Sequence, residues 1–223
     1  MSFENFVDEV WTDSHIRNFA PKQSTKQLSQ IFHELNHTPK AVLNCSWRSA
    51  ATIALESQGI SVDHVIDNQP IEGKQYDTIL ALDEYFTYFT SEENQRDEIA
   101  NISKLVAPGG VMLTSMRDYR NNPVHKRFMG DTSYININGS HHVVIEINTP
   151  NSEHNQIWHQ LNFVIKDGES AISYEIGDRR TLYFKQLAKY CKDAGSKQFG
   201  VIKENFWKAP WRRTTEHITW TRF

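Results

Sequence analysis

The stretch KAVLNCSWRSAATIALESQGISV, residues 40–62, constrains the fold of this chain more than any other. The apolar run AVLNC is typical of a buried strand. Residues 48–58 are typical of a helix, which Gly59 ends, and ISVDHVI is typical of a second strand. A strand, a helix and a strand in this order form a parallel unit, because the helix carries the chain back to the starting edge of the sheet. The chain is therefore predicted to contain a parallel α/β sheet.

The same alternation continues through the first half of the chain. Residues 76–86, YDTILALDEYF, read as a third strand, and residues 91–106 as a helix with Ser91 as its N-cap. The turn APGG then leads into the strand VMLTSM. An amphipathic helix over residues 24–37, with Ser24 as N-cap, precedes all of them. These elements predict an α/β fold with a doubly wound, mostly parallel sheet of the Rossmann-like type.

After Met116 the pattern changes to alternation with a period of two. One hairpin is predicted around Asn138-Gly139 and a second strand pair around Asp167-Gly168. A helix over 181–195 and two closing strands follow. The C-terminal half is thus expected to be rich in antiparallel strands. Residues 1–223 are interpreted as one domain, with a helical lead-in over about residues 1–38.

The charge and the cysteine content limit which cellular location and which binding partners the sequence allows. Two cysteines far apart, Cys45 and Cys191, favour a reducing cytoplasm over a disulfide framework. The net charge is −3, yet residues 179–223 carry eleven Lys and Arg against three Asp and Glu. A solvated basic surface is the simpler interpretation of this excess, and nucleic acid and membrane partners are not expected. The alternative is a docking face for a partner protein or a second copy, including Trp207, Trp211, Arg212 and Arg213.

The order of these elements resembles the class I S-adenosylmethionine-dependent methyltransferases. The residues that carry the resemblance are AVLNCSWRSAATIALESQGISV, YDTILALDEYFTYF and LVAPGGVMLTSMRDY. The second half is similar to the small-molecule enzymes related to glycine N-methyltransferase, in which a strand ends in Arg-x-Tyr, here Arg117 to Tyr119. The resemblance implies S-adenosylmethionine as cofactor and a small-molecule acceptor.

The cofactor side departs from the family pattern. Asn44 stands where the family usually has an acid, and Trp47 and Ser49 where it has glycines. Only eight residues separate Asp67, the candidate ribose ligand, from Tyr76, so a strand–helix unit is expected to be missing. Either the cofactor binds in an altered way or binding has been lost. The candidate cofactor-binding residues are Asn44, Cys45, Ser46, Ser49, Asp67 and Asp83.

The substrate side keeps more of the family's features. The resemblance implies that Arg117 holds a substrate carboxylate through its guanidinium fork, with a salt bridge to Asp118 or Glu84 as the alternative. Glu84 and Asp83, near the carboxyl end of the predicted third strand, would receive positive charge from the cofactor or the substrate. No metal site is predicted, because the histidines lack ligand spacing. The candidate catalytic residues are Glu84, Arg117 and Tyr119, and the candidate substrate-binding residues are Tyr85, Tyr88, Arg117 and Tyr134.

Three functions fit this sequence. The first is methylation of a small carboxylate-bearing, amino-acid-like molecule, with an amine as the acceptor. The second is a catalytically inactive relative that serves as a binding or partner subunit. The third is an enzyme that uses S-adenosylmethionine for cyclisation or cleavage, which the sequence does not distinguish from the first.

Overall fold

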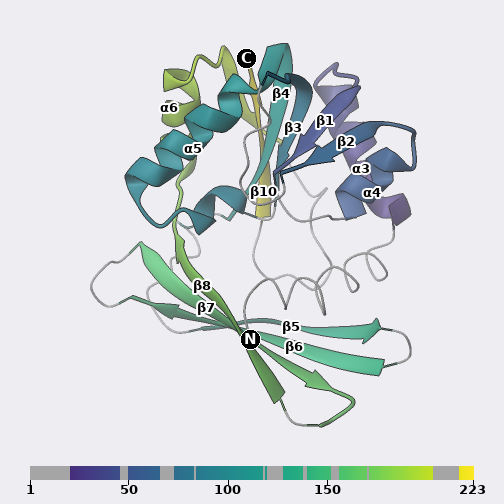
Figure 1. The fold of residues 1–223 in the computed structure, drawn as a ribbon, viewed down its shortest axis with the longest axis vertical. Coiled ribbons are helices and arrows are strands. Elements are labelled where there is room, and N and C mark those ends of the chain that lie inside the picture. Colours follow the sequence, from purple (N-terminus) through teal and green to yellow (C-terminus); the bar gives the residue numbers. More distant parts are fainter. Residues whose placement is uncertain are drawn as a thin grey trace.

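The computed structural model describes residues 21–45, 50–65, 73–82, 84–117, 119, 128–137, 140–151, 156–169, 171–202 and 216–223. These residues form a six-stranded sheet in the order β2-β1-β3-β4-β10-β9 and a four-stranded sheet in the order β5-β6-β7-β8. Figure 1 shows the first sheet with helices on its two faces and the second sheet as a separate layer beyond one end of its strands. The predicted fold class is confirmed.

The six-stranded sheet is parallel over its first four strands. β1 pairs in parallel with β2 and β3, and β3 with β4, whereas β10 runs antiparallel to β4 and β9 antiparallel to β10. β2 lies at the edge of the order, and no strand of the described residues pairs with its outer side. The strands are β1 (Ala41–Asn44), β2 (Ser61–His64), β3 (Tyr76–Ala81), β4 (Val106–Arg117), β9 (Gln198–Val201) and β10 (Glu216–Arg222).

Two hydrophobic clusters cover the two faces of this sheet. Leu43 and Ile79 belong to the cluster that packs against α5 (Glu92–Lys104) and α6 (Phe184–Asp193). Their sequence neighbours Val42 and Leu80 face α3 (Pro21–Glu34) and α4 (Ala50–Glu56). Successive strand residues point to opposite faces, so a strand covered on both sides is apolar throughout. Each fully buried aliphatic side chain contributes about 1.5 to 3 kcal/mol.

Three predicted boundaries are wrong, and each has a local cause. α3 begins at Pro21, a residue well suited to the first helical turn, so Ser24 lies inside the helix and is no cap. The APGG segment belongs to β4, where Gly109 has φ 80° and the register with β3 shifts. β3 ends at Ala81, and a 3₁₀ turn, η2 (Tyr85–Tyr88), follows it. By contrast, the Ser91 cap is confirmed, since its hydroxyl accepts from the Asn94 amide.

Both predicted strand pairs are confirmed in the four-stranded sheet. Its strands are β5 (Phe128–Ile137), β6 (Ser140–Pro150), β7 (Ile157–Lys166) and β8 (Ala171–Arg180), all antiparallel. Between β7 and β8, Asp167 and Gly168 take positive φ angles of 51° and 80°, as a tight hairpin turn requires. None of the helices in the described residues is long and apolar enough to cross a membrane.

The four-stranded sheet buries a face that is largely polar. The buried side chains of its two central strands are His142, Val144, Asn148, Trp158, Gln160, Asn162 and Val164. The intervening positions, which point to the other face, include the half-buried Val143, Ile145, Ile147, Leu161, Phe163 and Ile165. The usual arrangement, with the apolar face inside, is therefore reversed over the middle of this sheet.

Candidate active site

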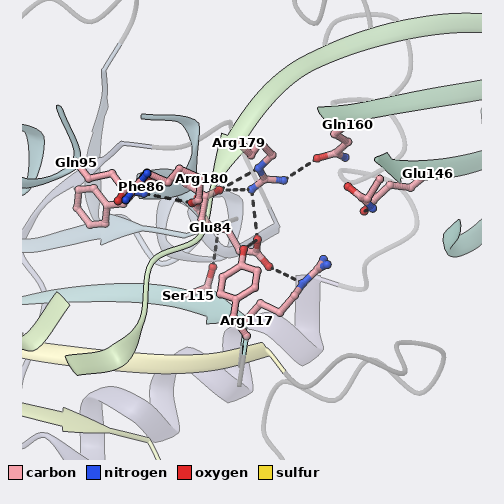
Figure 2. Close-up of polar contacts among 12 residues, drawn as sticks. Glu84, Phe86, Gln95, Ser115, Arg117, Glu146, Gln160, Arg179 and Arg180 are labelled. Carbon is pink, nitrogen blue, oxygen red and sulfur yellow. Dashed lines mark hydrogen bonds and ion pairs between the residues drawn. The ribbon is translucent and has the colours of Figure 1, made fainter. Parts of the chain in front are cut away.

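The candidate site lies where the carboxyl ends of β1, β3 and β4 meet, which is where open α/β sheets bind ligands. Glu84 follows β3, and Arg117 ends β4. Arg179, near the end of β8, reaches the same place from the four-stranded sheet. Figure 2 shows these three side chains converging.

Glu84 is held in an uncommon backbone conformation. Its φ of 54° and ψ of 36° are left-handed, a region that few non-glycine residues adopt. Its amide donates to the Ser115 hydroxyl at 2.9 Å, and its carbonyl accepts from the Thr87 hydroxyl at 2.7 Å. Such strain persists where surrounding contacts fix it, and it is frequent at functional sites.

The Glu84 carboxylate is almost completely buried, with 4% of the residue exposed. Arg117 Nε donates to Oε1 at 3.1 Å, and the Tyr119 hydroxyl donates to Oε2 at 2.9 Å. Arg179 Nη2 donates to the same Oε2 at 3.4 Å. Of the two roles considered for Arg117, the salt bridge to Glu84 is therefore present in the structure. Three donors from three side chains converge on this carboxylate, which therefore fixes the positions of Arg117, Tyr119 and Arg179.

Sequence reasoning missed the role of Arg179. It was assigned to a solvated basic surface, but its side chain is only 8% exposed. Its Nη1 donates to Gln160 Oε1 at 2.8 Å, and its Nε and Nη2 donate to the Thr87 hydroxyl at 2.9 and 2.7 Å. The guanidinium also lies 4.3 Å from the centre of the Tyr88 ring. The signal in the sequence is the alternation along the strand. Asp178 and Arg179 point to opposite faces of β8, and since Asp178 is exposed, Arg179 faces inward.

Tyr119 connects the same cluster to aromatic side chains. Its ring centre lies 5.4 Å from that of Trp158 and 6.4 Å from that of Tyr183. Burial, and then the Glu84 charge, raise the pKa of Tyr119 well above its ordinary value. The phenol therefore stays protonated and remains a hydrogen-bond donor to Glu84.

A glutamine on α5 supports the two segments that carry Glu84 and Arg179. Gln95 is buried, and its Nε2 donates to the carbonyls of Phe86 and Arg180 at 3.1 and 3.2 Å. The Gln95 side chain thus joins η2 to the end of β8, in addition to the salt bridge between Glu84 and Arg179 (Figure 2).

Tyr85 and Tyr88, two of the predicted substrate-binding residues, have different surroundings. Tyr88 packs against Arg179 and so belongs to the cluster. Tyr85 points into the hydrophobic core, where its hydroxyl donates to Glu98 Oε1 at 2.7 Å, and it does not join the cluster. Residues three apart share a side in a regular 3₁₀ turn, yet these two rings have different neighbours, since Tyr85 packs on Phe86 and Phe89.

Two of the predicted cofactor residues are described. Asn44 is fully buried at the end of β1, with Nδ2 3.2 Å from His64 Nδ1. Cys45 is buried in the core, its amide donates to the Leu80 carbonyl, and burial raises the pKa of its thiol. The Tyr76 hydroxyl and Lys74 both bond to Asp63 of β2. Ser46, Ser49, Asp67 and Asp83 lie outside the described residues, as does the side chain of Tyr134.

Asn44 is an amide where the family usually has an acid. The amide removes the charge, keeps one acceptor and adds two donors at the carboxyl end of β1. The side chains of Asn44 and Cys45 are both buried, with 0% and 5% of the residues exposed. Within the described residues, no group of three or more His, Cys, Asp or Glu side chains is placed to hold a metal ion.

Several solved structures share this fold over almost the whole chain. CcbJ, a methyltransferase from Streptomyces caelestis, superposes with a TM-score of 0.64 at 13% identity, covering 91% of this chain and 95% of CcbJ. CalS10, an amino pentose methyltransferase from Micromonospora echinaspora, gives 0.67 at 12% identity and covers 97% of both chains. KedS8, a sugar N-methyltransferase from Streptoalloteichus, gives 0.63 at 9% identity, covering 96% of this chain and 91% of KedS8.

The comparisons define the fold as that of S-adenosylmethionine-dependent methyltransferases. The similarity is structural, since all three identities are below 15%. No family model matches the sequence, and no curated protein matches it. The fold expected from the resemblance is therefore confirmed.

Proposed function

We propose that this chain is an S-adenosylmethionine-dependent methyltransferase that acts on an amine of a small molecule. The observation that carries the proposal is the buried Glu84 cluster at the carboxyl edge of the parallel strands, within a methyltransferase fold. A left-handed residue, two guanidiniums and a buried phenol each cost free energy. A cluster that served only to stabilise the fold would not need them.

The cofactor would lie at the end of β1, with Asn44 as its first described contact. When bound, it supplies a methyl group made electrophilic by the sulfonium charge. The chain then has to hold a neutral nucleophile in line, which is mainly a matter of positioning. In this proposal Glu84 orients Arg117 and Tyr119, and these two side chains orient the acceptor.

The resemblance implies a carboxylate-bearing acceptor held by Arg117, and a substitution of Arg117 tests this alternative. Arg117→Lys keeps the charge but loses the planar fork, so KM for such an acceptor should rise at least tenfold while kcat changes little. Arg96→Lys is the matched control, because Arg96 is exposed on α5 and its ion pair within the described residues is with its neighbour Asp97. Equal KM values for the two variants would remove Arg117 from the acceptor site.

Calorimetric titration with S-adenosylmethionine and S-adenosylhomocysteine tests the proposal itself. Micromolar binding of both is expected. The expected loss of one strand–helix unit between Asp67 and Tyr76 favours the second candidate, a non-catalytic partner subunit. Absence of binding at millimolar ligand would overturn the methyltransferase proposal and leave that candidate.

A further inference from the structure

The polar buried face of the four-stranded sheet continues from the Glu84 cluster. Arg179 donates to Gln160 on β7 at 2.8 Å. The pairing register sets Gln160 opposite Asn148 and Asn162 opposite Glu146, so four polar side chains occupy adjacent positions on one face. Figure 2 shows Gln160 and Glu146 beside the Arg179 guanidinium. We refer to Glu146, Asn148, Gln160 and Asn162 as the amide patch.

The amide patch is buried but incompletely hydrogen-bonded. Asn148, Gln160 and Asn162 are 0%, 6% and 3% exposed. Asn148 Nδ2 donates to Glu146 Oε1 at 2.6 Å, whereas Asn148 Oδ1 has no hydrogen-bond partner within the described part of the chain. Gln160 and Asn162 are joined by one long contact of 3.5 Å. A buried carbonyl oxygen without a donor is costly, and it indicates a missing donor from a ligand or a water.

The chemistry of the patch indicates which donor is missing. The orphaned oxygen and the Glu146 carboxylate are acceptors, and the carboxamides of Gln160 and Asn162 carry both donors and acceptors. Hydroxyl groups match such a surface, because each both donates and accepts. A carboxylate does not match it, since it only accepts and would approach Glu146.

The charge balance of the site gives the same result. Among the described residues, the guanidiniums of Arg117 and Arg179 lie at this site with 13% and 8% of their side chains exposed. Glu84 is bonded to both arginines, and the Glu146 charge acts to raise the pKa of Arg179. These two positive and two negative groups balance, so the described part of the site has no excess positive charge for an anionic substrate.

We propose that the amide patch is the acceptor subsite of this chain and binds the hydroxyl-bearing, uncharged body of the substrate. This inference rests on the proposed methyltransferase function. The substrate then spans the two sheets, with its amine near Glu84 and its hydroxyl groups against β6 and β7. The four-stranded sheet serves as the specificity element, and the six-stranded sheet carries the reaction.

Three amines separate the ligand classes in a calorimetric titration of the full chain saturated with S-adenosylhomocysteine. Glucosamine carries hydroxyl groups, cyclohexylamine is the ring without them, and glycine carries a carboxylate. Glucosamine is expected to bind at least tenfold more tightly than either of the others. Equal binding of glucosamine and cyclohexylamine, tighter binding of glycine, or no binding of glucosamine would overturn the proposal.

Two substitutions locate the binding on the patch. Asn148→Leu and Asn162→Leu should each weaken glucosamine binding at least tenfold and leave cyclohexylamine binding unchanged. Thr149→Val is the matched control, because Thr149 is exposed on the opposite face of β6. Thermal unfolding of each variant establishes that it is folded. If Asn148→Leu and Asn162→Leu both fold and bind glucosamine normally, Asn148 Oδ1 is served by a structural water and the proposal fails.

Glucosamine titrations with and without S-adenosylhomocysteine, together with a titration of S-adenosylhomocysteine itself, separate this inference from the proposed function. Glucosamine binding that depends on Asn148, in a chain that does not bind S-adenosylhomocysteine, would support the subsite and contradict the methyltransferase. Tight S-adenosylhomocysteine binding without preference for glucosamine would support the methyltransferase and contradict the subsite.

Discussion

The two sheets of this molecule bury opposite kinds of side chain. The six-stranded sheet packs aliphatic residues against helices on both faces, whereas the four-stranded sheet turns amides and charged groups toward the site. Apolar burial stabilises a fold, while polar burial costs free energy unless each group is hydrogen-bonded. The difference indicates a division of labour, in which the first sheet supplies stability and the second supplies chemical recognition.

The contact between the two sheets gives the largest expected effect. Glu84→Gln keeps the shape of the side chain but removes the negative charge between Arg117 and Arg179. Two buried guanidiniums then lose their counter-charge, so the free energy of unfolding should fall by about 3 to 5 kcal/mol. Methyl transfer should be lost as well. Urea unfolding and a turnover assay measure the two effects.

Glu92→Gln is the control for this change. Glu92 accepts from the Tyr190 hydroxyl, but its side chain is 62% exposed, so its removal should cost less than about 1 kcal/mol. Equal losses for the two variants would mean that the Glu84 cluster contributes no more than a surface contact.

A matched pair of truncations tests the difference between the sheets directly. Ile79→Ala removes a fully buried side chain of β3 and should lower the free energy of unfolding by about 2 to 5 kcal/mol. Ile145→Ala, at a half-buried position of β6 that faces away from the site, should lower it by about 1 kcal/mol. Urea unfolding of both variants measures these losses. A larger loss for Ile145 would show that this face of the four-stranded sheet is also a core.

The sequence predicted the fold well because the fold depends on local patterns. Apolar strands, the Ser91 cap, the turn at 167–168 and the pairing of β5 with β6 are each encoded within a few residues. The Glu84–Arg117 pair was also foreseen as one alternative, because consecutive parallel strands end at the same edge. Arg179 was not foreseen, because its burial depends on β8 folding back over η2, a contact between residues 92 positions apart. The polar face of the second sheet was missed for the same reason.

Two neighbouring arginines of β8 test the contact between the two sheets, with a smaller expected effect on stability. Arg179→Lys keeps the charge but loses the fork that bonds Thr87 and Gln160, so stability should fall by about 1 to 3 kcal/mol. Arg180→Lys loses one bond to Gln156 and should have an effect below about 1 kcal/mol. Chemical unfolding of both variants compares them. A larger loss of stability for Arg180→Lys than for Arg179→Lys would mean that Arg180, and not Arg179, holds the two sheets together.

The smallest effect concerns a second glutamate, Glu98 of α5, which lies over the six-stranded sheet. It has a tyrosine hydroxyl as partner but no ion pair in the described part of the chain. Burial raises the pKa of Glu98 above its ordinary value of 4.5, and the bond from Tyr85 opposes this only in part.

The sign of the pH dependence follows from that shift. The folded chain holds the Glu98 proton more tightly than the unfolded chain does. The stabilising contribution is therefore complete below pH 4.5 and is lost as the pH rises through the raised pKa. Glu98→Gln is always neutral and retains an acceptor for Tyr85, so it should be more stable than the parent at neutral pH. The difference should shrink toward zero as the pH falls to 4.5. Urea unfolding over a pH series measures it, and a variant that is less stable at neutral pH would mean that the ionised Glu98 is favourable, as Glu84 is between its two arginines.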